Sequence, residues 1–186
     1  MTQSDSLSAA IAALHAGGVI AYPTEAVWGL GCDPANEAAV QQLLALKQRD
    51  IAKGMILVAA DVVQVEHLLA GLDASQRQAV LTSWPGPNTW VVPVPASFYP
   101  WVRGQHLSVA LRVSAHPGVQ ALCRAFGGPL VSTSANRSGE EPALSEAGVR
   151  EQFGDALAAI LPGALGGDAK PTSIRDALTG AVLRAR

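Results

Sequence analysis

Three cations fall within seven residues of this sequence, between an expected helix and an expected buried strand. They are Lys47, Arg49 and Lys53, in the stretch LKQRDIAKGMILV. One interpretation is structural, because cations at the end of a helix complement its dipole and cap its carbonyl groups. The other is a phosphate clamp, because ligands bind at strand ends in α/β sheets and cations there neutralise phosphate charge. The residue types alone leave both interpretations open.

A second group of polar side chains follows the apolar run PLV, in the stretch VSTSANRSG. Because side chains alternate along a strand, Ser132, Ser134 and Asn136 can share one side, with Thr133 and Ser138 beside them. An ordinary turn rich in serine and asparagine would have the same composition. No GxSxG motif surrounds these serines and no histidine or acid is marked by sequence to activate one. We therefore expect ligand donors rather than nucleophiles.

The stretch YPTEAVWGLGCD, residues 22–33, directly follows the apolar run GGVIA and concentrates special residues. Pro23 biases the preceding residue toward an extended backbone, and Thr24 offers a hydroxyl group. Gly29 and Gly31 allow a backbone to approach a substrate or a neighbouring loop closely. We therefore expect a loop that is shaped around a ligand at the end of a buried strand.

Two further charged residues have alternative interpretations. Arg112 in ALRV lies inside a strand pattern, where an arginine is either held in a buried ion pair or directed at an anion. Glu25 either orients a cation such as Lys47 or is solvated, and we favour orientation. The histidines share no metal-like spacing and receive no role; they are His15, His67, His106 and His116.

The usual nucleotide-binding motifs are absent from the sequence. Gly29 and Gly31 begin like a dinucleotide fingerprint, but Pro34 stands where the third glycine belongs. The phosphate-binding pattern GxxxxGK[ST] does not occur. A nucleotide site in this protein must therefore be built differently.

The chain has 186 residues, 49% of them hydrophobic, which is enough to bury the core of one compact domain spanning 1–186. Its net charge of -2 and its 15% of charged residues argue against binding nucleic acid or acidic membranes through bulk charge. Cys32 and Cys123 lie far apart without metal-ligand spacing, so we expect free thiols in a reducing compartment. No apolar run reaches about 18 residues, so we expect no membrane span and a cytoplasmic protein.

The period of the apolar pattern switches repeatedly between helix and strand. It predicts helices over 6–15, 37–48, 63–69, 74–83, 117–127 and 144–154. It predicts strands over 19–22, 55–60, 89–94, 107–113 and 129–136, and the tail adds short apolar segments at 158–161, 172–178 and 181–184. This alternation predicts an α/β fold, with a mixed sheet because 85–113 contains strands without a helix between them.

Six motifs together resemble the YrdC family of threonylcarbamoyl-AMP synthases, in its short bacterial TsaC form. They are YPTEAVWGLGCDP, ALKQRDIAKGMILVA, WPGPNT, SVALRVSAHP, PLVSTSANRSGEEP and PTSIRDALTG. They follow in order over nearly the whole chain, and the family's KxR plus SxN pairing is met by Lys47, Arg49, Ser134 and Asn136. The resemblance implies a twisted mixed parallel/antiparallel sheet with covering helices around a basic concave cavity.

The resemblance also implies a reaction. L-Threonine, bicarbonate or CO2, and ATP would give threonylcarbamoyl-adenylate and pyrophosphate, for the threonylcarbamoyl-adenosine modification of tRNA. The adenylate would pass to a tRNA-modification transferase complex of the TsaB/TsaD/TsaE type. Mg²⁺ would arrive with ATP as substrate, without a dedicated metal cage and without a bound prosthetic group.

Site residues are implied in three groups. The catalytic residues bordering the reacting groups are Lys47 and Asn136. The ATP contacts are Arg49, Lys53, Ser108, Ser134 and Arg184. The threonine contacts are Thr24, Arg112, Ser132 and Thr172. Many relatives have proline and histidine where this chain has Asp50 and Val58, and Arg175 is a weaker candidate because Asp176 can pair with it.

The alternative from another class is an RNA-binding module in tRNA or ribosome maturation, without catalysis of its own. Against it, the chain is mildly acidic and has no aromatic platform interleaved with its cations. Weak RNA binding can still accompany catalysis. A domain cut from a larger hydrogenase-maturation protein is disfavoured, because no zinc-finger or acylphosphatase segment accompanies it.

Overall fold

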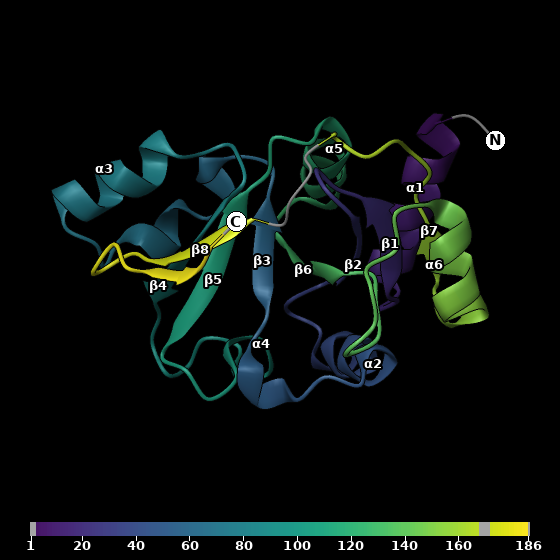
Figure 1. Ribbon diagram of the computed structural model, residues 1–186, viewed down its shortest axis with the longest axis horizontal. Helices are drawn as coiled ribbons and strands as arrows, with labels where there is room; N and C mark the ends of the chain where they lie inside the picture. The colour runs from purple at the N-terminus through teal and green to yellow at the C-terminus, as the bar shows by residue number, and fades with distance from the viewer. Residues whose placement is uncertain (1–2, 168–171, 186) are drawn as a thin grey trace.

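A computed structural model of the chain describes residues 3–167 and 172–185. Over these ranges it contains one sheet of nine strands with helices packed on it (Figure 1). The strands are β1 (Ile20–Pro23), β2 (Trp28–Cys32), β3 (Ile56–Ala59), β4 (Asn88–Pro93), β5 (Ser108–Val113), β6 (Leu130–Ser134), β7 (Ala159–Ile160), β8 (Ser173–Asp176) and β9 (Val182–Arg184). The α-helices are α1 (Gln3–His15), α2 (Glu37–Lys47), α3 (Ala74–Thr82), α4 (Pro100–Arg103), α5 (Pro117–Phe126) and α6 (Glu146–Phe153).

The strands lie in the order β7-β1-β2-β6-β3-β5-β4-β8-β9. Strands β1 and β7, β3 and β5, and β4 and β8 pair in parallel, whereas the other neighbours pair antiparallel. The predicted mixed α/β sheet is therefore confirmed. Among the described residues, no helix is both long and apolar enough to cross a membrane.

The stretch 22–33 forms a β-hairpin instead of one continuous loop, and its residues 24–29 line the cavity that the prediction placed beside it. The backbone N–H of Thr24 donates to the carbonyl of Val27 at 3.1 Å, which closes a tight turn between β1 and β2. Gly31 lies inside β2, where a Cβ would come within 2.6 Å of the Val131 carbonyl oxygen. Glycine here serves close packing within a sheet, and such glycines look like loop residues in a sequence.

Two other predicted segments also differ from the structure. The helix predicted over 63–69 is two short 3₁₀ helices, Val62–Gln64 and Glu66–Leu69, because the buried Val65 between them takes φ −126°. The helix α4 lies between β4 and β5, where the sequence predicts none. Its four residues are too few to show a helical period.

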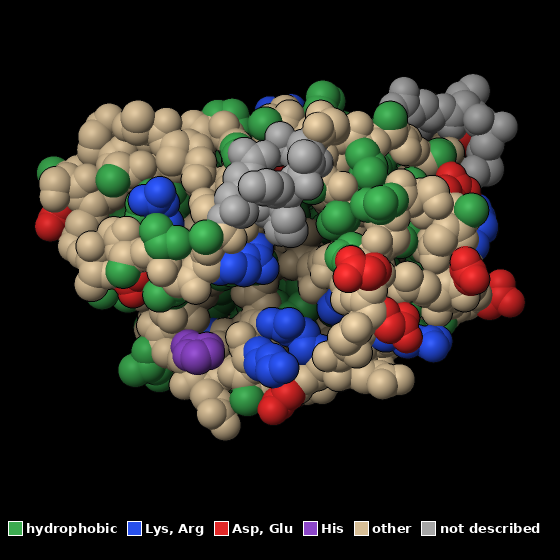
Figure 2. Space-filling model, in the orientation of Figure 1, with side chains coloured by type: hydrophobic (Ala, Val, Ile, Leu, Met, Phe, Trp, Pro, Cys, Tyr) green, Lys and Arg blue, Asp and Glu red, His purple; other side chains and the backbone are tan. Residues whose placement is uncertain are grey.

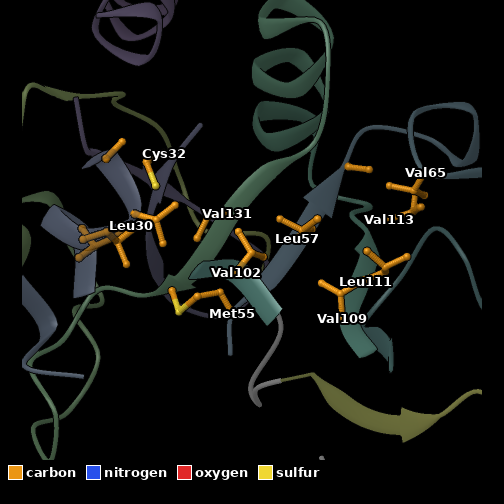
Figure 3. Packing of buried hydrophobic residues seen from close by; sticks show 14 of the residues in the cluster. Leu30, Cys32, Met55, Leu57, Val65, Val102, Val109, Leu111, Val113 and Val131 are labelled. Atoms are coloured by element: carbon orange, nitrogen blue, oxygen red, sulfur yellow. The ribbon is translucent and has the colours of Figure 1, made fainter. Parts of the chain in front are cut away.

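The two faces of the sheet pack against different helices. On one face, Leu57, Leu111 and Val131 of three adjoining strands lie in one buried cluster with Val102 of α4 (Figure 3). Side chains of α2 and α6 belong to the same cluster. On the other face, α1 and α5 contact each other and form a second cluster through side chains such as Leu14 and Leu122. No described residue of β4, β5 or β8 belongs to this second cluster, which leaves their part of the face for a cavity.

Alternation along β5 shows how the sheet divides its side chains between core and cavity. Leu111 and its neighbours two residues away are fully or almost fully buried in the first cluster. Ser108, Ala110 and Arg112 point to the opposite face and line the cavity. Because side chains alternate between the two faces of a strand, Arg112 can lie inside β5 and still point away from the core.

Candidate active site

The cavity lies on the open part of the sheet face and has a volume of about 680 Å³, within the usual range of small-molecule sites. Figure 2 shows a hollow in the middle of the molecule, with Lys and Arg side chains gathered around it. Nine predicted site residues line the cavity: Thr24, Arg49, Lys53, Ser108, Arg112, Ser132, Ser134, Thr172 and Arg184. Segments that are up to 160 residues apart in sequence (24 and 184) thus share one space.

Positive charge prevails in the lining. Its described cationic side chains are Arg49, Lys53, Arg103, Arg112 and Arg184, against the two carboxylates Glu25 and Asp176. A molecule with net charge -2 therefore concentrates cations at one place, as binding of a polyanion requires. The cations predicted from sequence are brought together here with two carboxylates that the predicted site did not include.

Arg112 and Glu25 form an ion pair at the floor of the cavity. The Arg112 Nη2 atom lies 2.5 Å from Glu25 Oε2, and the two side chains are 11% and 9% exposed. Ser114 Oγ at 2.7 Å and the backbone N–H of Ala115 at 3.1 Å both donate to Glu25 Oε1. Arg112 therefore meets both sequence interpretations, because it is paired and also lines the cavity.

Glu25 therefore orients a cation, as the sequence predicted, but this cation is Arg112 and not Lys47. Burial by itself would raise the pKa of Glu25, but the Arg112 guanidinium and the Ser114 hydroxyl lower it below the ordinary 4.5. The carboxylate is therefore ionised at neutral pH. The Nε atom of Arg112 is buried without a hydrogen-bond partner among the described residues, so this donor remains available to a ligand.

Arg49 and Lys53 reach the cavity from the short connection between α2 and β3. The connection contains the 3₁₀ helix Ile51–Lys53, which Asp50 caps by accepting a hydrogen bond from the Ala52 N–H at 2.8 Å. The Arg49 Nη2 atom donates to the Gly54 carbonyl at 3.0 Å, while its buried Nε finds no partner in the described chain. Burial and the nearby Arg184 lower the pKa of Arg49. A ligand with negative charge would relieve both the lost hydration and the repulsion.

Lys47 lies behind the cavity wall and does not line it, in contrast to the sequence prediction that it borders the reacting groups. Its Nζ donates to the Ser134 carbonyl at 2.5 Å, to the Asn136 carbonyl at 2.7 Å and to Asn136 Oδ1 at 3.4 Å. These contacts use the three donors of an ammonium group. Burial, followed by the nearby Arg49, lowers the pKa of Lys47 to about 8. The lysine joins the end of α2 to the segment that follows β6.

Asn136 also lies outside the cavity lining, beyond the end of β6. Its Oδ1 accepts from Ser134 Oγ at 2.5 Å, and its Nδ2 donates to the carbonyls of Arg137 and Glu140 at 2.9 Å each. The predicted alignment of Ser132, Ser134 and Asn136 on one side therefore holds for the two serines alone. Strand alternation ends at Ser134, so the periodic argument does not extend to Asn136.

The remaining predicted hydroxyls line the cavity with their own partners. Thr24 Oγ1 donates to the Val27 carbonyl at 2.7 Å, so its proton serves the hairpin turn. Thr172 Oγ1 lies 3.2 Å from Thr89 Oγ1, and Arg184 Nη2 donates to the Thr172 carbonyl at 2.8 Å. Burial lowers the pKa of Arg184, and the positive charge of Arg112 lowers it further. The two guanidinium groups are therefore close enough to repel each other.

The predicted site did not include five polar residues of the lining: Glu25, Arg103, His106, Thr133 and Asp176. Arg103 closes α4 and donates to the carbonyls of Ala96, Gly104 and His106. The helix α4 is too short to show a helical period in the sequence, so no sequence pattern pointed to Arg103. Asp176 was considered as a partner for Arg175, but its Oδ1 accepts the backbone N–H groups of the turn after β8.

The described residues offer no metal cage and no activated nucleophile. Glu25 and Asp176 are the carboxylates of the lining, and no described group of three possible metal ligands exists. Cys32 and Cys123 are free and buried, as predicted, and burial raises the pKa of each thiol to about 12. The cavity is therefore suited to hold anionic groups with cations and fixed donors, and to stabilise charge that develops between them.

Comparison with known proteins places this geometry in a family. A family model for Sua5, YciO and YrdC proteins, described as "Telomere recombination", matches residues 12–185. The chain belongs to the Sua5/YciO/YrdC family. The resemblance inferred from the motifs is therefore confirmed over almost the whole sequence.

Two bacterial relatives of this Sua5/YciO/YrdC protein carry the name threonylcarbamoyl-AMP synthase. The Chromohalobacter salexigens protein is 59% identical over 181 residues, which cover 97% of this chain and 97% of the relative. The Stenotrophomonas maltophilia protein is 60% identical over 181 residues, which cover 96% of this chain and 97% of the relative.

Solved structures of the family share the fold. P. abyssi Sua5 complexed with L-threonine matches with a TM-score of 0.82 at 27% identity, over 95% of this chain and 52% of that one. The present chain thus spans about half the length of that Sua5 protein. E. coli YciO matches with a TM-score of 0.84 at 24% identity, over 98% of this chain and 89% of that one.

Proposed function

We propose that this protein is a threonylcarbamoyl-AMP synthase and that residues 1–186 act as a single YrdC-like domain. The substrates are L-threonine, bicarbonate or CO2, and ATP, and the products are threonylcarbamoyl-adenylate and pyrophosphate. The observation that carries the proposal is the identity of 59% and 60%, over nearly the full length, with two relatives of that name. The basic cavity supports it, because it gathers cations and hydroxyl groups from remote segments in one space.

The proposed reaction brings two anions together. The neutral amine of threonine adds to the carbon of CO2 and loses one proton to solvent, which gives a carbamate. A carbamate oxygen then attacks the α-phosphorus of ATP. The bond from this phosphorus to the bridging oxygen breaks, and pyrophosphate leaves. Cations and fixed donors must hold both reactants, so catalysis comes mainly from positioning and charge stabilisation.

The amino-acid end is assigned to the neighbourhood of Arg112. A guanidinium matches the flat, bidentate geometry of a carboxylate, and the unpartnered Nε of Arg112 gives it a donor for this contact. Glu25 stabilises the arginine before substrate arrives, because it balances the charge of a side chain that is 11% exposed. Its lowered pKa makes Glu25 a weak base, so we assign it this electrostatic role and no proton transfer. Thr24, Ser132 and Thr172 complete the threonine pocket.

The triphosphate end is assigned to Arg49 and Lys53, with Arg184, Ser108 and Ser134 as further ATP contacts. Arg49 supports this assignment best, because its buried guanidinium has an unpartnered Nε and a lowered pKa. The phosphate-clamp interpretation of the sequence thus applies to two of the three clustered cations. Lys47 and Asn136 act on the ATP site indirectly, because their hydrogen bonds hold the backbone and the hydroxyl group of Ser134 in place.

Mg²⁺ would reach this site as the counter-ion of the ATP phosphates. The lining carboxylates do not fit a dedicated cage, since Glu25 is paired with Arg112 and Asp176 Oδ1 accepts two backbone N–H groups. The adenylate would serve a tRNA-modification transferase complex of the TsaB/TsaD/TsaE type, and we assign no RNA-binding surface.

The decisive experiment is an assay of pyrophosphate release with ATP, threonine and bicarbonate. We expect release that requires all three substrates, together with threonylcarbamoyl-adenylate as the product in mass spectrometry. Omission of each substrate in turn is the control. Pyrophosphate formed equally without threonine would indicate an unrelated ATPase, and absent release combined with tight RNA binding would favour the RNA-binding module.

A further inference from the structure

Tyr22 of β1 belongs to the apolar cluster under α1 and α5 and reaches the cavity residue Ser132. It is fully buried, and its register partner across the β1–β2 hairpin is Gly29. A Cβ on Gly31 would lie 2.8 Å from the Tyr22 hydroxyl oxygen and 2.8 Å from its ring. The tyrosine therefore occupies the space that the missing side chain of Gly31 leaves, and its ring has one available position.

The Tyr22 hydroxyl makes a hydrogen bond to the cavity residue Ser132. Its oxygen lies 2.9 Å from Ser132 Oγ, and the phenol is the donor. A phenol is a stronger acid than an alkyl hydroxyl, which favours this direction. Burial raises the pKa of Tyr22 above its ordinary 10, so the phenol keeps its proton at any working pH.

This bond decides what the Ser132 hydroxyl can offer a ligand. A serine hydroxyl has one proton, and its oxygen here already accepts from Tyr22. Ser132 lines the cavity, and its hydroxyl proton has no acceptor among the described residues. The proton is therefore free to point at an acceptor atom of a bound molecule.

Two other hydroxyls of the same lining have the opposite arrangement. Ser134 Oγ donates to Asn136 Oδ1, and Thr24 Oγ1 donates to the Val27 carbonyl. Both therefore present lone pairs to the cavity, whereas Ser132 presents a proton. The three side chains are chemically alike, and their protein partners give them different roles.

We propose that Tyr22 is a positioning residue that makes Ser132 a hydrogen-bond donor to an anionic oxygen of the amino-acid substrate. The oxygen belongs to the carboxylate or to the carbamate formed on the amine. Both are acceptors without protons, and the hydrogen bond that Ser132 Oγ accepts from Tyr22 strengthens its own hydroxyl as a donor to them. The inference rests on the proposed function and adds to it a residue that does not line the cavity.

The test is a double-mutant cycle between Tyr22→Phe and Ser132→Ala, with threonine and ATP affinity measured separately by calorimetry. Tyr22→Phe keeps the ring and removes the donor. We expect it to weaken threonine binding about 3- to 10-fold and to leave ATP binding within about twofold, in line with the loss of one hydrogen bond. Combined with Ser132→Ala, it should add nothing to the loss that Ser132→Ala causes alone.

The matched control is Tyr99→Phe, because Tyr99 is the other tyrosine of the chain and does not line the cavity. It should change neither affinity. The inference is overturned if Tyr22→Phe leaves threonine binding unchanged, if both ligands weaken equally, or if the two losses multiply in the double variant. If Tyr22→Phe fails to fold, Ser132→Ala decides, because unchanged threonine binding in that variant also refutes the donor role.

Failure of this inference can be distinguished from failure of the proposed function. If the wild-type protein releases pyrophosphate with all three substrates but the cycle is additive, the inference alone is wrong. If the wild-type protein releases none, the proposed function is wrong as well.

Discussion

Two parts of one sheet face have opposite characters. Under α1 and α5, the face presents Ile20 and Leu130, which are fully buried in an apolar cluster. Farther along the same strand β6, Ser132 and Ser134 line the open cavity together with Arg112 of β5. The strands are continuous across the boundary, so the difference comes from where the covering helices end. One face of a sheet can therefore carry both a core and a binding site.

The two parts also differ in how they hold charge. The covered cluster consists of hydrophobic side chains, whereas the open part holds Arg112, which is 11% exposed, together with the exposed Lys53 and Arg184. Arg112 is balanced by Glu25, and Lys47 behind the wall is satisfied by carbonyl groups. Substitutions in the two parts should therefore separate stability from ligand binding.

Glu25→Gln should give the largest loss of stability, although the residue lies in the open part. It leaves the buried Arg112 without its counter-charge, so we expect the free energy of unfolding to fall by about 3–5 kcal/mol. Urea unfolding measures this loss. A change well under about 1 kcal/mol would mean that solvent in the cavity already screens the pair.

The same variant tests the pH dependence. The pKa of Glu25 is lower in the folded protein than its ordinary 4.5, so the stability that it contributes is present above that value. This stability is lost as pH falls through the folded pKa. The difference between wild type and Glu25→Gln should therefore shrink from about pH 7 to about pH 3. A difference that stays constant with pH would contradict the ion pair.

Leu122→Ala tests the covered part. The side chain is fully buried between α5 and the sheet, so its truncation should lower the free energy of unfolding by about 2–5 kcal/mol. Threonine and ATP affinities, measured by calorimetry on the folded protein, should stay within about twofold of wild type. A large loss of affinity would show that the covered cluster and the cavity are energetically coupled.

Arg112→Lys tests the open part with little change in charge. Lysine keeps the positive charge beside Glu25 but lacks the planar fork that matches a carboxylate. We expect threonine binding to weaken about 10- to 100-fold and ATP binding to change less than about threefold. Calorimetric titration with each ligand measures the two effects. Equal losses for both ligands would remove Arg112 from the amino-acid end.

Lys47→Met should show its effect as a change in how stability depends on pH. The pKa of Lys47 is about 8 in the folded protein and 10.5 in its ordinary state. The unfolded chain therefore binds more protons between these values, and the stability contribution of Lys47 rises with pH across that window. Methionine has no such titration. Urea unfolding of both proteins at several pH values should show wild type gaining relative to Lys47→Met, and parallel curves would contradict the lowered pKa.

Some elements can be predicted from signals within their own segment of sequence, and others cannot. The helix α5 begins with Pro117 and ends before Gly127, with buried Val119 and Leu122 at helical spacing between them. These signals lie within one segment, so the sequence predicts the helix correctly. Strand β2 contains Gly31, whose purpose is visible only when the ring of Tyr22 lies against it. A pattern of residues cannot distinguish such a glycine from a loop glycine.

The site shows the same division. The spacing of Arg49 and Lys53 predicts a cation cluster, and both side chains line the cavity. Lys47 belongs to the same cluster in sequence, yet its ammonium faces carbonyl groups 87 and 89 residues away. Whether a cation at the end of a helix points into the cavity or toward carbonyl groups therefore depends on that remote segment. The ligand roles of the lining residues stay predictions until substrates are bound.

The sequence by itself determined the mixed α/β class and the family, and nine of the eleven site residues that it predicted line the cavity, because periodicity and motifs are local properties of the chain. Tertiary structure alone decided which polar groups are partners: Glu25 with Arg112, and Tyr22 with Ser132. A hydrogen bond depends on distance and direction between atoms, and these partners are 87 and 110 residues apart. The fold brings them within 3 Å, and that contact fixes the charge and proton that each presents to a ligand.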